Sequence, residues 1–105
     1  MEHLHRAALD ALGDANRRAI VEMLGRGERS VGQIADGLDI SRPAVSRHLR
    51  LLKDAGLVVD RPEGTRRLYH LHEAGVDAVR RYFHEVWSDA AVRFRLAAEN
   101  TEPRP

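Results

Sequence analysis

Two short amphipathic segments, separated by only a few residues, constrain the fold of this chain more than any other feature. The first follows Ser30, a helix-capping residue, and the second follows Ser41 and ends at Gly56. In both segments apolar residues recur at intervals of three and four, which is the period of an α-helix. These positions are Val31, Ile34, Ala35 and Leu38 in the first segment, and Val45, Leu49, Leu52 and Ala55 in the second. The pattern predicts two helices joined by a tight turn.

The same periodicity predicts two helices before this pair and a long helix near the end of the chain. The first ends at Gly13, and Asp14 is placed to cap the second, which Gly25 terminates. From Val76 onward a long apolar seam repeats at helical spacing, which favours packing on another helix. The seam comprises Val76, Val79, Phe83, Val86, Ala90, Phe94 and Ala97, and Tyr82 and Trp87 flank it.

A β-hairpin is predicted between the fourth and the last helix. Residues 57–59 and 67–72 are short runs of β-forming side chains, and residues 62–65 between them form a turn. The fold class expected from these patterns is therefore mainly α-helical, with about five helices and one hairpin.

Length and composition predict a single domain without covalent cross-links. The chain has 105 residues and no cysteine, which excludes disulfides and thiolate metal sites. Residues 1–98 are expected to form the domain, and residues 99–105 a flexible tail. A core of this size is marginal, so association of two chains is expected. The apolar runs are too short to span a membrane and the amino terminus lacks the profile of an export signal, so we expect a cytoplasmic protein with no membrane partner.

The basic residues are concentrated in about a quarter of the chain. Residues 41–67 contain seven basic and three acidic residues, although the formal net charge of the whole chain is only +1. A local excess of positive charge on a nearly neutral protein favours a polyanionic partner such as nucleic acid.

The second helix of the pair carries side chains that suit the reading of DNA. With Val45, Leu49 and Leu52 facing the core, the opposite face presents arginines and a serine, which donate hydrogen bonds to base edges and phosphates. Solvated helix faces of any protein are also charged, so it is the order of caps, tight turn and arginines that indicates a DNA-binding helix-turn-helix. The residues expected to contact double-stranded DNA from this helix are Ser41, Arg42, Pro43, Ala44, Ser46, Arg47, His48 and Arg50.

The predicted hairpin carries a second basic group near its turn. Arg61, Thr65, Arg66 and Arg67 are expected to contact the phosphate backbone. Such contacts add affinity and salt dependence but little sequence preference. The two basic groups should therefore respond differently to mutation.

Three segments resemble the ArsR/SmtB family of winged-helix repressors: residues 11–20, 41–58 and 64–71. The middle segment, with Ser-x-x-x-Val-Ser-x-His-Leu and then Ala-Gly-Leu-Val, is the most specific of the three. The resemblance implies a homodimer built on the first and last helices, a fourth helix in the major groove of an inverted-repeat operator, and a hairpin wing beside the backbone. It also implies repression of a promoter, often the regulator's own. One departure is Ala15-Asn16, where many members have Pro-Thr, and we expect it to leave the function unchanged because Asp14 still caps the helix.

Combined with this resemblance, the apolar seam predicts where two chains meet. The expected interface residues are Leu4 and Leu9 of the first helix, and Val79, Phe83, Val86, Trp87, Ala90 and Phe94 of the last. A dimer of this kind presents two DNA-reading helices to two half-sites.

No metal site or cofactor of the usual kind is expected. The resemblance implies two common kinds of metal site. One needs cysteines in the third helix, which has none. The other needs histidines and carboxylates at fixed spacing along the last helix, and the spacing of Asp77, His84, Glu85 and Asp89 does not match it. The chain thus resembles the members without metal ligands. Two alternatives stay open: a nonstandard site of scattered His, Asp and Glu residues, and a small-molecule effector pocket. The aromatic residues considered for that pocket are Tyr69, Tyr82, Phe83, Trp87 and Phe94.

An enzyme is not expected. The sequence contains no Gly-x-Ser-x-Gly turn, no glycine-rich phosphate loop ending in lysine and no His-Glu-x-x-His helix. A winged-helix module that binds another protein is a further alternative, and salt-dependent binding of DNA would distinguish a regulator from it.

Overall fold

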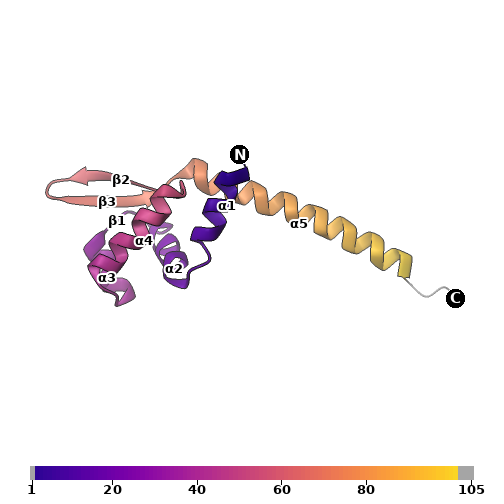
Figure 1. The fold of residues 1–105 in the computed structure, drawn as a ribbon, viewed down its shortest axis with the longest axis horizontal. Coiled ribbons are helices and arrows are strands. Elements are labelled where there is room, and N and C mark those ends of the chain that lie inside the picture. The colour runs from indigo at the N-terminus through magenta and orange to yellow at the C-terminus, as the bar shows by residue number, and fades with distance from the viewer. Residues whose placement is uncertain (1, 102–105) are drawn as a thin grey trace.

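The structure is a computed structural model that describes residues 2–101, with side chains described for residues 6–99. Its elements are α1 (Glu2–Ala11), α2 (Ala15–Leu24), β1 (Arg29–Ser30), α3 (Val31–Leu38), α4 (Arg42–Asp54), β2 (Val58–Glu63), β3 (Arg66–Leu71) and α5 (Glu73–Thr101). Helices α1 to α4 form the body, the β2–β3 hairpin extends from one side and α5 from the other (Figure 1). This arrangement confirms the predicted winged helix-turn-helix fold.

The expected capping residues begin three of the helices. The Asp14 side chain accepts a hydrogen bond from the backbone N–H of Arg17 at 3.0 Å, and Ser41 accepts one from Ala44 at 3.2 Å. Ser30 caps α3 in a reciprocal arrangement in which the backbone and side chain of one residue, Gln33, bond back to it. These bonds fix where α2, α3 and α4 start, and hence how α3 and α4 meet.

The turn between α3 and α4 depends on one strained residue. Asp39 follows α3 in the left-handed region, with φ of 54°. An aspartate tolerates this conformation better than most side chains do. Its backbone N–H donates to the carbonyl of Ala35, which ends α3 and sends the chain directly into α4.

The sheet has three antiparallel strands in the order β1-β3-β2. The hairpin register continues to the pair Glu63 and Arg66, so the predicted wide turn over 62–65 is wrong and the loop consists of Gly64 and Thr65 alone. Gly64 has φ of 61°, as the first position of a tight two-residue hairpin turn requires. Pro62 lies within β2, where an edge strand tolerates the missing N–H.

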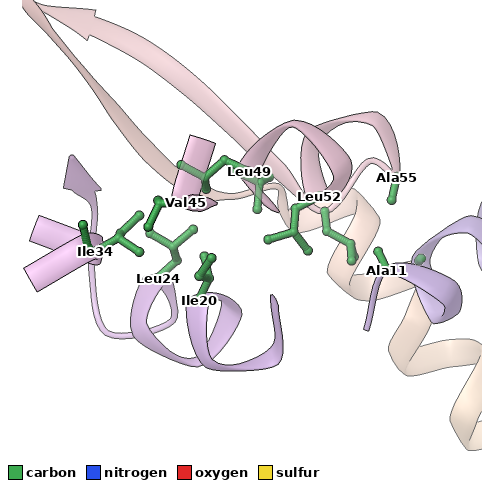
Figure 2. Close-up of a cluster of buried hydrophobic side chains, with 12 residues drawn as sticks. Ala11, Ile20, Leu24, Ile34, Val45, Leu49, Leu52 and Ala55 are labelled. Carbon is green, nitrogen blue, oxygen red and sulfur yellow. The ribbon is translucent and has the colours of Figure 1, made fainter. Parts of the chain in front are cut away.

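The core lies between α1, α2, α3 and α4, and Figure 2 labels buried side chains that these helices contribute to it, with Ala55 directly after α4. Ile20, Ile34, Val45 and Leu52 have no exposed surface, and Leu49 is 1% exposed. Each fully buried side chain of this size contributes about 1.5–3 kcal/mol of hydrophobic stabilisation. Burial of the apolar stripe of α4 sets the rotation of that helix about its own axis.

Helix α5 begins at Glu73, three residues before the predicted start, and projects well beyond the body (Figure 1). Its first turn packs closely on the segment that follows α4, because a Cβ placed on Gly75 would overlap the carbonyl oxygen of Gly56. The helix continues to Thr101, past the expected start of the tail at Glu99, and residues 102–105 lie outside the described part. Within residues 2–101, none of the helices is both long enough and apolar enough to cross a membrane.

Candidate nucleic-acid interface

The outer face of α4 presents unpaired arginines to solvent. Because Val45 and Leu49 are buried, Ser46, Arg47 and Arg50 lie on the exposed side of the helix. Within the described residues no salt bridge involves Arg47 or Arg50, so both guanidinium groups keep all their donors for a ligand. Guanidinium forks of this kind match guanine edges and phosphate oxygens.

Some residues at the start of α4 make contacts within the chain, and others are exposed to solvent. Ser41 is exposed, but its hydroxyl accepts the capping bond from Ala44. Pro43 is exposed and Ala44 is half-buried. The guanidinium group of Arg42 does not extend along the outer face of the helix: it lies over Gly32 of α3, where an added Cβ would be 2.9 Å from Arg42 Nη2.

His48 lies on the side of α4 that faces α2. It is half-buried, and its Nδ1 atom is 3.4 Å from Arg17 Nη1. The Nε atom of Arg17 donates to the carbonyl of Ala11 at 2.6 Å, so this arginine also satisfies the end of α1. His48, expected among the DNA contacts, therefore packs between α4 and α2.

In the wing, Arg61 is held by an acid from outside the hairpin. Its Nε and Nη2 atoms donate to the two carboxylate oxygens of Glu28, each at 2.9 Å. This pair lowers the pKa of Glu28 and raises the pKa of Arg61, in both cases mainly through the hydrogen bond between them. No local pattern predicts this pairing, because Glu28 precedes β1, a two-residue strand that periodicity does not predict.

A second acid, Asp60, joins the wing to the end of α4. Its side chain is only 7% exposed and contacts Lys53 Nζ at 2.8 Å and Arg67 Nε. Hydrogen bonds from Lys53 and then from Arg67 lower the pKa of the Asp60 carboxyl. Arg67, expected on the DNA backbone, is therefore neutralised within the chain.

The tip of the wing retains one loosely paired arginine. Arg66 Nη2 is 3.6 Å from Glu63 Oε2, and both side chains are about half exposed. Thr65, in the hairpin loop, is also exposed. Of the three wing arginines, Arg66 has the longest ion pair, so breaking that pair loses the least interaction energy.

A groove lies between the start of α3 and the wing. Its volume is about 420 Å³, and its lining includes Gly32, Arg42, Arg66, Arg67 and Tyr69. The structure thus brings together three of the predicted DNA-contacting arginines, from α4 and β3, around one space. Sequence reasoning missed Gly32 and considered Tyr69 only for an effector pocket, because nothing in their local pattern places them beside the arginines.

The apolar seam of α5 is largely exposed within one chain. Phe83 is 42% exposed, Trp87 69% and Phe94 77%. Leu9 of α1 and Val79 of α5 are half-buried, and the side chain of Leu4 lies outside the described residues. A single chain therefore leaves most of the predicted interface without a covering surface.

The other sites considered from sequence can also be located. No group of three or more His, Cys, Asp or Glu residues among those described is arranged to hold a metal ion. Tyr69 lies on β3, whereas Tyr82 and Phe83 pack edge to face on α5 with ring centroids 5.9 Å apart. The aromatic residues considered for an effector pocket therefore come from two separate regions.

Comparison with known proteins agrees with this geometry. A family model described as a helix-turn-helix domain matches residues 12–61. The chain is 52% identical to the HTH-type transcriptional regulator Rv2034 of Mycobacterium tuberculosis, over 79% of this chain and 78% of that protein. It is 37% identical to the transcriptional repressor SdpR of Bacillus subtilis, over 59% of this chain and 69% of that protein.

Among solved structures, one similar fold is a homodimeric winged helix-turn-helix DNA-binding domain from Mycobacterium bovis, described as a possible ArsR-family transcriptional regulator. The match has a TM-score of 0.66 and 32% identity, and covers 85% of this chain and 80% of that one. These similarities confirm the prediction of a regulator rather than an enzyme. On the combined sequence and structural likeness, the chain belongs to the ArsR/SmtB family of winged helix-turn-helix transcriptional regulators.

Proposed function

We propose that this protein is a homodimeric repressor that binds double-stranded DNA through α4 and the wing. The observation that carries the proposal is the outer face of α4, where Arg47 and Arg50 are exposed without an acidic partner among the described residues while the inner face is buried in the core. A helix held in this way presents its donors to the major groove without rearranging the core. The proposed operator is an inverted repeat. The proposed location of the protein is the cytoplasm.

Two features support the homodimer. Helix α5 exposes a seam of large apolar side chains that water solvates poorly, and the similar domain from Mycobacterium bovis is described as homodimeric. The proposed interface consists of Leu4, Leu9, Val79, Phe83, Val86, Trp87, Ala90 and Phe94. A two-fold dimer built there presents two α4 helices to half-sites about 34 Å apart.

The proposed roles of the basic residues differ between α4 and the wing. Ser46, Arg47 and Arg50 read base edges, whereas Thr65 and Arg66 contact the backbone. Arg61 and Arg67 contribute less to DNA affinity than their charge suggests, because Arg61 must first break its ion pair with Glu28 and Arg67 its ion pair with Asp60. Repression follows from occupation of the promoter, in line with the repressor SdpR, to which the chain is similar.

The test is a mobility-shift titration with the DNA upstream of the protein's own gene and with random DNA, across a range of salt concentrations. About six phosphate contacts predict a slope of roughly −5 for log affinity against log salt. Tighter binding to the upstream DNA than to random DNA is expected. A protein that binds neither DNA at low salt would overturn the proposal in favour of a protein-binding module.

A further inference from the structure

The groove between α3 and the wing owes its shape to a missing side chain. At Gly32, an added Cβ would be 2.9 Å from Arg42 Nη2 and 3.2 Å from its Cζ, both closer than ordinary contact. The guanidinium group of Arg42 therefore rests against the backbone of α3 only because residue 32 is glycine. In this position Arg42 lines the groove rather than the outer face of α4.

The guanidinium groups that line the groove are only partly paired with acidic side chains of this chain. Arg42 takes part in none of the ion pairs found among the described residues. Arg66 has a long contact of 3.6 Å with Glu63, and Arg67 is paired with Asp60. None of the described residues that line the groove is acidic, so an anion placed there meets guanidinium groups from two elements.

We propose that this groove binds one phosphodiester group of the DNA backbone, with Arg42 and Arg66 as its charged donors and Gly32 as the residue that leaves room for them. The inference rests on the proposed DNA binding and deepens it. It assigns Arg42 to the backbone alone, whereas the sequence pattern left both base edges and phosphates open for this residue.

The chemistry of the groove fits a phosphodiester. Guanidinium groups donate in a fork that matches two phosphate oxygens, and arginines from two elements approach such a group from two directions. Tyr69 is half-buried and packs against the core, so its ring forms a fixed wall of the groove. The space is bounded by the start of α3, the start of α4 and the wing, so a phosphate held there fixes the DNA backbone relative to α4.

The experiment fills the space at residue 32 while leaving every charge in place. Gly32→Ala removes a helix-disfavouring residue and conflicts only with the flexible end of Arg42, so the thermal midpoint should stay the same or rise. Gly32→Leu occupies more of the groove. We expect DNA affinity to fall about 3-fold for Gly32→Ala and about 10-fold for Gly32→Leu, equally on operator and random DNA, with the salt slope smaller by about one.

Two further variants make the result specific. Gly37→Ala makes the same change on α3, outside the groove, where the conflict is with the flexible end of Met23, and should bind DNA as the wild type does. Arg42→Ala should reproduce the loss seen for Gly32→Leu, again without preference for operator or random DNA. The thermal midpoint of each variant shows that it is folded.

The possible results separate this inference from the proposed function. If the wild type binds DNA and folded Gly32→Leu binds it equally well, the groove holds no phosphate and only this inference fails. A loss confined to the operator would overturn it too, because it would place the groove against bases. If added inorganic phosphate stabilises the wild type but not Gly32→Leu while their DNA affinities agree, the groove binds a free anion instead. A wild type that binds no DNA overturns both.

Discussion

The outer face of α4 and the wing are both rich in arginine, but they hold their charge differently. On α4, Arg47 and Arg50 form no salt bridge among the described residues. In the wing, Arg61 pairs with Glu28 and Arg67 with Asp60. Counting arginines in the sequence therefore overstates the positive charge that the wing can present to a ligand.

The difference has a physical origin. A helix whose apolar stripe is buried directs its opposite face into solvent, away from other parts of the chain. A hairpin lies beside the elements from which it extends, and there it meets Lys53 at the end of α4 and Glu28 before β1. Exposed ion pairs add little stability, so DNA can compete for the wing arginines, but the net gain is smaller than for the free arginines of α4.

The largest expected effect comes from separating the two copies that present these surfaces. Phe83→Glu together with Phe94→Glu places charge in the apolar seam of α5, and we expect monomers that bind an operator of two half-sites about 100-fold more weakly. Light scattering and mobility shifts measure the two effects.

The matched control for this change is Val92→Glu, which alters an exposed apolar residue of α5 outside the predicted seam. This variant should stay dimeric and bind DNA normally. A Phe83→Glu, Phe94→Glu protein that still has the mass of a dimer would refute the seam as the interface.

The next effect distinguishes base reading from backbone contact. Arg47→Ala removes an unpaired guanidinium from the outer face of α4, and we expect a loss of about 1–3 kcal/mol on the operator and a much smaller loss on random DNA. Parallel titrations of the two DNAs give the ratio. Equal losses on both would show that Arg47 contacts phosphate rather than bases.

Within the wing, the arginine with the longest ion pair should matter most. Arg66→Ala is expected to weaken binding about 3-fold on operator and random DNA alike, whereas Arg61→Ala should weaken it less, because Arg61 already pairs with Glu28. Salt titrations of both variants provide the comparison. A larger loss for Arg61→Ala would mean that DNA displaces Glu28 with little cost.

The last effect concerns the stability of the fold and its pH dependence rather than DNA binding. The pKa of Asp60 lies below its ordinary value of 3.8, so the carboxylate stabilises the folded state fully above that pH and loses this contribution as the pH falls through the folded pKa. Asp60→Asn should lower the free energy of unfolding by about 1 kcal/mol at neutral pH, since both cationic partners are about half exposed.

Denaturant unfolding of the wild type and Asp60→Asn at several pH values tests this. The difference in unfolding free energy should shrink below the ordinary pKa of the carboxyl. A difference that is the same at neutral and strongly acidic pH would mean that Asp60 acts through packing rather than charge.

Local patterns were sufficient for most of the fold. The caps at Asp14, Ser30 and Ser41 and the apolar stripe of α4 are read within a few residues, because a capping bond spans three residues and a helical repeat spans seven. The hairpin was predicted with a turn that is too wide. Its exact register depends on pairing across the strands, which pulls Pro62 and Glu63 into β2.

The sequence by itself determined the winged helix-turn-helix fold, the buried face of α4 and the family, because each rests on contacts between near neighbours or on contiguous motifs. Only the tertiary structure decided which arginines are free. The partners Glu28 and Arg61 are separated by 33 residues, and Gly32 meets Arg42 only after the turn at Asp39 folds α4 back against α3. Ion pairs and close contacts of this kind depend on distances in space, which the folded chain sets and residue spacing does not.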